Sequence, residues 1–208
     1  MPTAADSQPD PPSPSPAPDA DFAATLIRTR QHVGPKRLHP PGPDSARIDA
    51  YFQAAAAAPD HGQILPWRFV VIPDARRGAL GEAFAAALRE RDPQAAQSDL
   101  DEARGKARRA PFIALAIVRE GGDGHPEIPP HERLVSLGCA IQNILLQSHA
   151  DGFAAGLVSG KALESRAIRA LFALTPNERA VCFLAIGTAL QRKPARQRPA
   201  PERFVSRL

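Results

Sequence analysis

This 208-residue sequence has few cysteines and no long apolar run. The first absence argues against a disulfide-bonded or zinc-binding protein, and the second against a membrane protein. The two cysteines, Cys139 and Cys182, stand alone among apolar neighbours and lack the paired spacing of zinc or redox ligands. They predict buried free thiols, as in a reducing compartment. No run reaches the roughly 18 apolar residues of a transmembrane helix, and the N-terminus lacks the basic and apolar segments of a secretory signal. We therefore expect a cytoplasmic protein without a membrane span.

Proline is abundant, and it is concentrated at the N-terminus. Residues 1–20 contain seven of the 23 prolines, no Lys or Arg, and no large apolar side chain beyond Met1. Such a segment cannot bury enough surface to offset the entropy of ordering it, so we predict a disordered Pro-rich tail. A ligand for a proline-binding domain is the alternative, but the flanking basic residues of such ligands are missing.

Helix and strand patterns alternate over residues 21–208, which we expect to form one domain. Asp21 and Asp44 are expected to cap the first two helices, and Phe22, Leu26 and Ile27 lie on one side of the first. Buried strands separated by helices predict an α+β fold of three layers, a central mixed sheet flanked by helices. The predicted helices are 21–31, 45–58, 75–91, 98–109, 131–150 and 164–174, and the predicted strands are 67–72, 112–118, 153–159 and 180–187.

Several polar clusters have simple structural interpretations. His125 and His131 flank a Pro-rich loop without a third ligand at metal spacing, so we interpret them as solvated loop residues. Lys106, Arg108 and Arg109 end a helix, where the helix dipole favours cations and a nucleic-acid contact is the alternative. The tail 190–208 has six basic residues but lacks the interleaved aromatic residues that stack on bases. Neither nucleic acid nor a metal ion is therefore expected as a partner.

Five short strings occur in the order found in a known family of flavoenzymes. With them the chain resembles the nitroreductase family over roughly residues 22–208, and within it the small single-domain subgroup. The resemblance implies an oxidoreductase that holds FMN, takes hydride from NAD(P)H, and reduces nitroaromatic- or quinone-like acceptors by a ping-pong mechanism. It also implies a homodimer with two flavin sites at the interface. The strings are Ala58-Pro59-Asp60-His61 followed by Pro66-Trp67-Arg68-Phe69, then residues 106–111, 136–140, 151–160 and 183–188.

The same resemblance implies which residues hold the flavin. No side chain is given a catalytic role, because the flavin itself carries out the redox chemistry. Outside these strings, His61 would be interpreted as a loop residue capping a turn, and Trp67 is interpreted as a core anchor of its strand. The implied flavin-binding residues are Arg30, Gln31 and His32 for the phosphate clamp, Ala57 and His61 at the helix end and loop, Leu157, Val158 and Ser159 along the ring, and Arg196 in the basic tail.

The chain departs from the family pattern at positions that are often polar in relatives. Leu65 precedes Pro-Trp where Gln or Asn is frequent, Ala57 has no polar side chain, and Val158 stands where an arginine can occur. Each change removes a polar contact, which leaves a flavin-binding or regulatory module with little turnover as the alternative function. Helix 131–150, with small residues at 138–140, suits the centre of a dimer as well as the core of a monomer.

Overall fold

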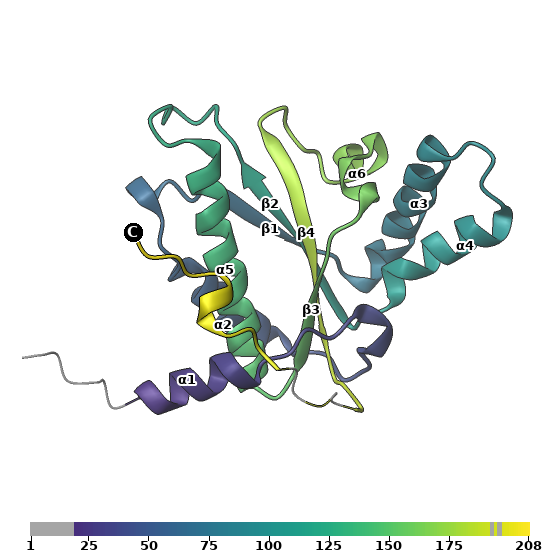
Figure 1. Cartoon of the computed structure of the whole chain (residues 1–208). Coiled ribbons are helices and arrows are strands. Elements are labelled where there is room, and N and C mark those ends of the chain that lie inside the picture. Colours follow the sequence, from purple (N-terminus) through teal and green to yellow (C-terminus); the bar gives the residue numbers. More distant parts are fainter. Residues whose placement is uncertain (1–18, 192–193, 195–196) are drawn as a thin grey trace, which may run out of the picture.

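The computed structural model describes residues 19–191, 194 and 197–208, so most of the predicted N-terminal tail lies outside the described residues. Helices and strands alternate along the chain, as the sequence patterns predict (Figure 1). The helices are α1 (Ala20–Thr29), α2 (Ser45–Ala56), α3 (Asp74–Arg91), α4 (Gln97–Gly105), α5 (Pro130–Ala150) and α6 (Arg166–Leu171). The strands are β1 (Trp67–Val71), β2 (Phe112–Arg119), β3 (Ala154–Val158) and β4 (Glu178–Gly187). Short 3-10 turns are η1 (Pro35–Arg37), η2 (His61–Gln63), η3 (Lys106–Arg108), η4 (Lys161–Glu164) and η5 (Pro201–Arg203).

The α+β class is confirmed, but the prediction of a mixed sheet is wrong in its strand directions. The strand order is β1-β2-β4-β3, and every neighbouring pair is antiparallel. β2 and β3 do run in the same direction and are joined by the crossover helix α5, but β4 lies between them. The parallel pairing that the described residues contain is the isolated bridge between His32 and Ala155.

One face of the sheet is covered by α2 and α5 (Figure 1). Tyr51 of α2 and Leu137 and Ile144 of α5 pack on Leu184 of β4, and all four are buried. The predicted cap of α2 is confirmed, because the Asp44 carboxylate accepts a hydrogen bond from the Arg47 N–H at 2.9 Å.

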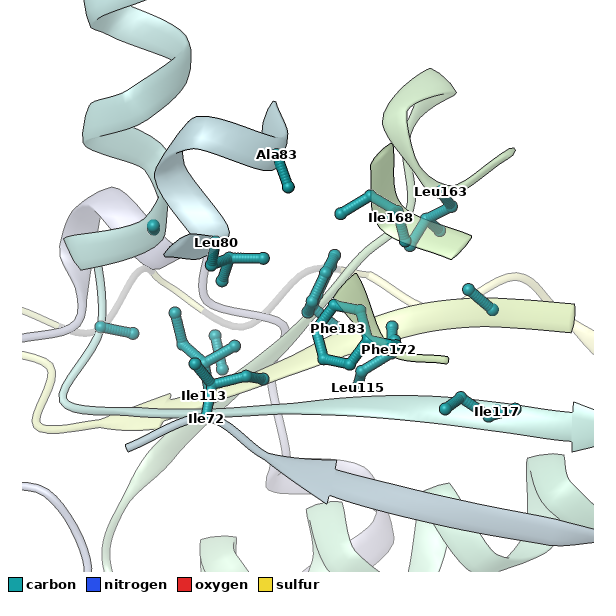
Figure 2. Packing of buried hydrophobic residues seen from close by; sticks show 14 of the residues in the cluster. Ile72, Leu80, Ala83, Ile113, Leu115, Ile117, Leu163, Ile168, Phe172 and Phe183 are labelled. Carbon is teal, nitrogen blue, oxygen red and sulfur yellow. The ribbon is translucent and has the colours of Figure 1, made fainter. Parts of the chain in front are cut away.

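The other face is covered by α3 and α6, with α4 packed alongside α3 (Figure 1). Figure 2 shows Leu80 of α3 and Ile168 of α6 on one side of this core, and Phe183 of β4 with Ile113 of β2 on the other. The Phe84 and Phe183 rings meet edge to face with their centroids 5.5 Å apart. A cavity of about 400 Å³ adjoins this second core.

Helix α1 has an apolar side that the described chain covers only in part, since Leu26 is half-buried. The helix begins at Ala20 after Asp19, so the prediction of Asp21 as its cap is wrong, and Asp21 lies in the first turn. Phe22 remains 63% exposed and Ile27 56% exposed. Amphipathic spacing had predicted burial, and the spacing alone does not say whether the covering surface belongs to the same chain.

Both cysteines are free, and they differ in burial. Cys182 is buried, and the loss of solvent raises the pKa of its thiol to about 11. Cys139 is only half-buried on α5, so the prediction that both thiols are buried is wrong for this one. Among the described helices, none is both long enough and apolar enough to span a membrane.

Candidate functional site

The predicted phosphate clamp lies against the first half of β3. After α1 ends, the Val33 N–H donates to the Ala155 carbonyl at 2.9 Å, and the Leu157 N–H donates to His32 Nδ1 at 3.4 Å. This close approach requires Gly156, since a Cβ there would lie 2.2 Å from the Val33 carbonyl oxygen. The segment containing Arg30, Gln31 and His32 is thus held beside the strand that carries the predicted ring-contacting residues.

The Arg30 side chain lies beside a second cation, and its Nε lacks a hydrogen-bond acceptor among the described residues. Its Nε is buried, with no hydrogen-bond partner among the described residues. The Arg198 guanidinium lies beside it and donates to the Arg30 carbonyl at 3.0 Å. Burial and the nearby charge of Arg198 lower the pKa of Arg30. Two neighbouring guanidinium groups that have no counterion among the described residues form a site that an anion would stabilise.

The predicted ring-contacting residues adjoin a cavity of about 400 Å³. Val158 and Ser159 form part of its wall, about 10 Å along β3 from Ala155 at the usual rise per residue of a strand. Leu80, Ile113 and Phe183 form its apolar floor, and Figure 2 shows these side chains converging between α3 and the sheet. The positively charged side chains in its lining are Lys36, Arg91, Lys106, Arg109 and Lys161.

Lys106 and Arg109 are functional candidates that the sequence interpretation missed. Their position at the end of α4 suited the helix dipole, and Lys106 begins the turn η3 that follows the helix. In the folded chain both side chains line the cavity. The sequence does place a cluster of cations just before the buried strand β2, which predicts positive charge at the end of that strand. It does not show that these side chains face a cavity.

A second hollow of about 320 Å³ lies on the α5 side of the same strand. Leu157 and Ser159 form one wall, and the other comes from Leu137, Gly138 and Ile141 of α5. Its lining within the described chain contains no charged side chain. The end of β3 therefore borders a charged cavity on one face of the sheet and an uncharged hollow on the other.

Ala57 and His61, the other predicted flavin-binding residues, come from the end of α2 and the turn η2 after it. Ala57 ends α2, and His61 Nδ1 lies 2.8 Å from Glu132 Oε2 in the first turn of α5. The clamp is tied to the other end of that helix, where Thr29 Oγ1 lies 2.9 Å from His149 Nε2. Glu132 and His149 are 17 residues apart in α5, which corresponds to about 25 Å. One chain does not bring His61 to Arg30, and Arg196 lies outside the described residues.

The loop that carries His61 has an unusual backbone. Gly62 (φ 70°), Gln63 (φ 53°) and Leu65 (φ 45°) all adopt positive φ angles, which are unfavourable for the two residues with side chains. The Asp60 carboxylate holds the loop by accepting from the Leu65 N–H at 2.7 Å. Strain of this kind collects at binding sites and tight turns, and here it directly follows His61, which contacts Glu132 of α5.

Known proteins resemble the chain in sequence and in fold. The pattern that defines the nitroreductase family matches residues 29–188. A protein of Haemophilus influenzae predicted to be an NAD(P)H nitroreductase is 31% identical over 170 residues, which cover 82% of this chain and 90% of the relative. A nitroreductase-like protein of Bacillus cereus superimposes with a TM-score of 0.77 at 17% identity, covering 89% of this chain and 95% of its own. An FMN-dependent nitroreductase of Mycobacterium smegmatis, solved with NADPH, gives 0.68 at 18% identity, with 91% and 99% covered.

Proposed function

The chain belongs to the nitroreductase family, and on this basis we propose that it is an FMN-dependent oxidoreductase using NAD(P)H to reduce nitroaromatic or quinone-like acceptors. The observation that carries the proposal is the pair of guanidinium groups, Arg30 and Arg198, beside the strand that leads to the cavity at Val158 and Ser159. An elongated ligand with an anionic end and a flat apolar end fits this arrangement. FMN has that shape and charge.

The residues present suit each part of the cofactor. Arg30 and Arg198 would hold the phosphate, assisted by Gln31, His32 and Arg196. The buried Nε of Arg30 then gains the acceptor that the described chain does not supply. Leu157, Val158 and Ser159 would lie along the ring. Lys36, Lys106 and Arg109 would place positive charge near its polar edge, where negative charge develops on reduction.

FMN, when bound, supplies the two-electron chemistry that no protein side chain provides. For a nitroaromatic acceptor the balanced reaction is NAD(P)H + H⁺ + ArNO₂ → NAD(P)⁺ + ArNO + H₂O, and a quinone would take the same two electrons and two protons to become a hydroquinone. The chain's contribution is to hold the cofactor, keep one apolar slot open beside it, and set the local charge. Because donor and acceptor would use that slot in turn, we expect ping-pong kinetics.

The positions of Ala57 and His61 support a homodimer. A second copy placed with its α5 antiparallel to the first would bring the partner's loop toward the clamp of this chain. The exposed Phe22 and Ile27 and the uncharged hollow beside Gly138 offer apolar surface for such a contact. Deleting residues 190–208 should then weaken FMN retention and dimerisation together, measured by flavin absorbance after gel filtration and by sedimentation. A truncated protein that stays dimeric and yellow would contradict this assembly.

One spectrum tests the enzymatic proposal. Purified protein loaded with FMN should lose its absorbance near the visible flavin maximum on anaerobic addition of NADPH or NADH, and a nitroarene should restore it. The alternative, a flavin-binding or regulatory module, is favoured by the apolar residues Ala57, Leu65 and Val158. Tight FMN binding without reduction by either nucleotide would decide for that alternative.

A further inference from the structure

The cavity beside Val158 and Ser159 has an unbalanced charge. Its described lining contains five cations, Lys36, Arg91, Lys106, Arg109 and Lys161, and no carboxylate. A single acid outside the lining, Glu102, lies 3.6 Å from Lys36 and 3.0 Å from Arg109. Glu102 also interacts electrostatically with Lys106, whereas Arg91 and Lys161 form no ion pair with the described residues. One carboxylate thus serves three of the five cations, and most of the positive charge at the cavity is not neutralised by the described residues.

Bound flavin would not balance this charge either. Its phosphate would be held at Arg30, beside the Ala155 end of β3 rather than at the cavity, and its ring would carry at most one negative charge when reduced. Lys36, Lys106 and Arg109 are more than sufficient for that single charge. Arg91 from the last turn of α3 and Lys161 from η4 have no counterion among the described residues. Clustered like charges in a concave apolar site attract an anionic ligand.

We propose that this cavity selects an electron acceptor that is both aromatic and anionic, a ring bearing a carboxylate or sulfonate. The inference rests on the proposed function and names the substrate class of the same site. The half-buried Phe84, which packs on Phe183, offers apolar surface to the ring, and Arg91 and Lys161 meet the charge. Nitrobenzoates and quinone carboxylates or sulfonates belong to this class. Neutral nitroarenes of the same shape fit the floor but leave both cations without a partner.

The test compares 4-nitrobenzoate with 4-nitrobenzamide, which have the same shape but differ in charge. With FMN-loaded protein and saturating NADPH at low ionic strength, kcat/KM should favour the benzoate by about tenfold, as steering by local charge allows. Lys161→Gln and Arg91→Gln should each move this ratio toward one. Arg89→Gln is the matched control, since Arg89 is as exposed as Arg91 on the same helix but lies outside the cavity lining, and it should leave the ratio unchanged. Added salt at about 0.3 M should shrink the preference.

A binding measurement separates this proposal from the proposed function. Calorimetric titration with benzoate and benzamide reports the charge preference without turnover. Equal reduction of both nitro compounds, with equal binding of benzoate and benzamide, would overturn the proposal and leave the oxidoreductase function standing. Preferential, Lys161-dependent binding of benzoate without any flavin reduction would support the anionic aromatic site and refute the enzymatic function. A change in the NADPH-to-NADH preference of Lys161→Gln, with the acceptor ratio intact, would assign the charge to the donor's phosphate and overturn the proposal.

Discussion

Two arginines at opposite ends of α5, one buried and one half-buried, differ in how many of their buried N–H groups have hydrogen-bond acceptors. Arg133, in the first turns of the helix, is 1% exposed, and its guanidinium meets Asp123 as well as the carbonyls of His125 and Ile128 at 2.8 and 2.9 Å. Arg30, near the other end, has a buried Nε without a described partner and a second arginine beside it. The chain completes one of these sites and leaves the other incomplete.

The difference separates a structural group from a binding group. A buried charge is tolerated when every donor finds an acceptor, and Arg133 fixes the 120–130 loop on that basis. A buried donor without an acceptor opposes folding unless something outside the chain supplies one. Charge alone does not distinguish the two arginines, since both are permanent cations. Their partners do.

Removing the counter-charge of Arg133 should have the largest effect on stability. Asp123→Asn leaves the Arg133 guanidinium buried without a counter-charge, and we expect the free energy of unfolding to fall by about 3–5 kcal/mol. Urea unfolding at neutral pH measures it. The FMN dissociation constant of the folded variant should match that of the parent, and a stability loss below about 1 kcal/mol would show that the pair does not behave as a buried ion pair.

Acid should weaken a second satisfied site in a defined pH window. The bidentate contact with Arg68 (Nε–Oε1, 2.7 Å; Nη2–Oε2, 3.0 Å) lowers the pKa of Glu178 to about 2, and Arg133 does the same for Asp123. Because both folded values lie below the unfolded ones, the stabilisation is complete above about pH 4.5 and is lost as pH falls toward 2.

For Glu178 this loss approaches about 3 kcal/mol. Urea unfolding at pH 7, 5 and 3 should give similar free energies at the first two values and a lower one at the third. Glu178→Gln should be less stable at pH 7 and should show a shallower fall below pH 5. An unchanged slope in this variant would assign the acid sensitivity to other groups.

The incomplete site should respond in the opposite way. Arg30→Met removes a phosphate donor, so FMN binding should weaken by about 10- to 100-fold, or about 1.4–2.8 kcal/mol. The flavin-free protein should keep its stability or gain some, because the buried donor and the repulsion with Arg198 are both relieved. Fluorescence titration with FMN and urea unfolding of the flavin-free protein give the two numbers. A stability loss without an affinity loss would make Arg30 a structural group like Arg133.

The smallest expected effect is the response of the flavin-free protein to a simple anion. Inorganic phosphate at ten times its dissociation constant should stabilise the folded state by about 1.4 kcal/mol, visible as a rise in the melting temperature. Chloride at equal ionic strength is the control for screening. Arg30→Met should abolish the difference between the two salts, and a difference that persists in this variant would place the anion site elsewhere.

Much of the fold was accessible from the sequence because it depends on local patterns. Asp44 was identified as a cap from its position before an apolar helix, and β2 from a short run of apolar residues. Strand direction was not accessible, since β4 enters between β2 and β3 from the end of the chain. The exposure of Phe22 was also missed, because amphipathic spacing specifies a face without specifying what covers it.

The candidate site was predicted by resemblance, and only part of it is assembled in the described chain. Arg30 and Val158 lie along one strand, as a ligand-binding segment requires, while His61 is at the far end of α5. The flavin contacts themselves remain predictions. Lys106 and Lys161 could not be grouped in advance, because their shared cavity depends on how α4 and η4 pack against the sheet.

The pairing of Val33 with Ala155 also has a consequence for the time course of folding. The two residues are separated by more than half of the chain, and the hydrogen bond between them forms on β3, whose neighbouring strand in the described sheet is β4. Contacts between such distant positions require a large loop to close, and they form late unless an earlier structure has brought them together. The clamp would therefore be completed after the sheet, and recovery of flavin binding during refolding should trail recovery of the buried core.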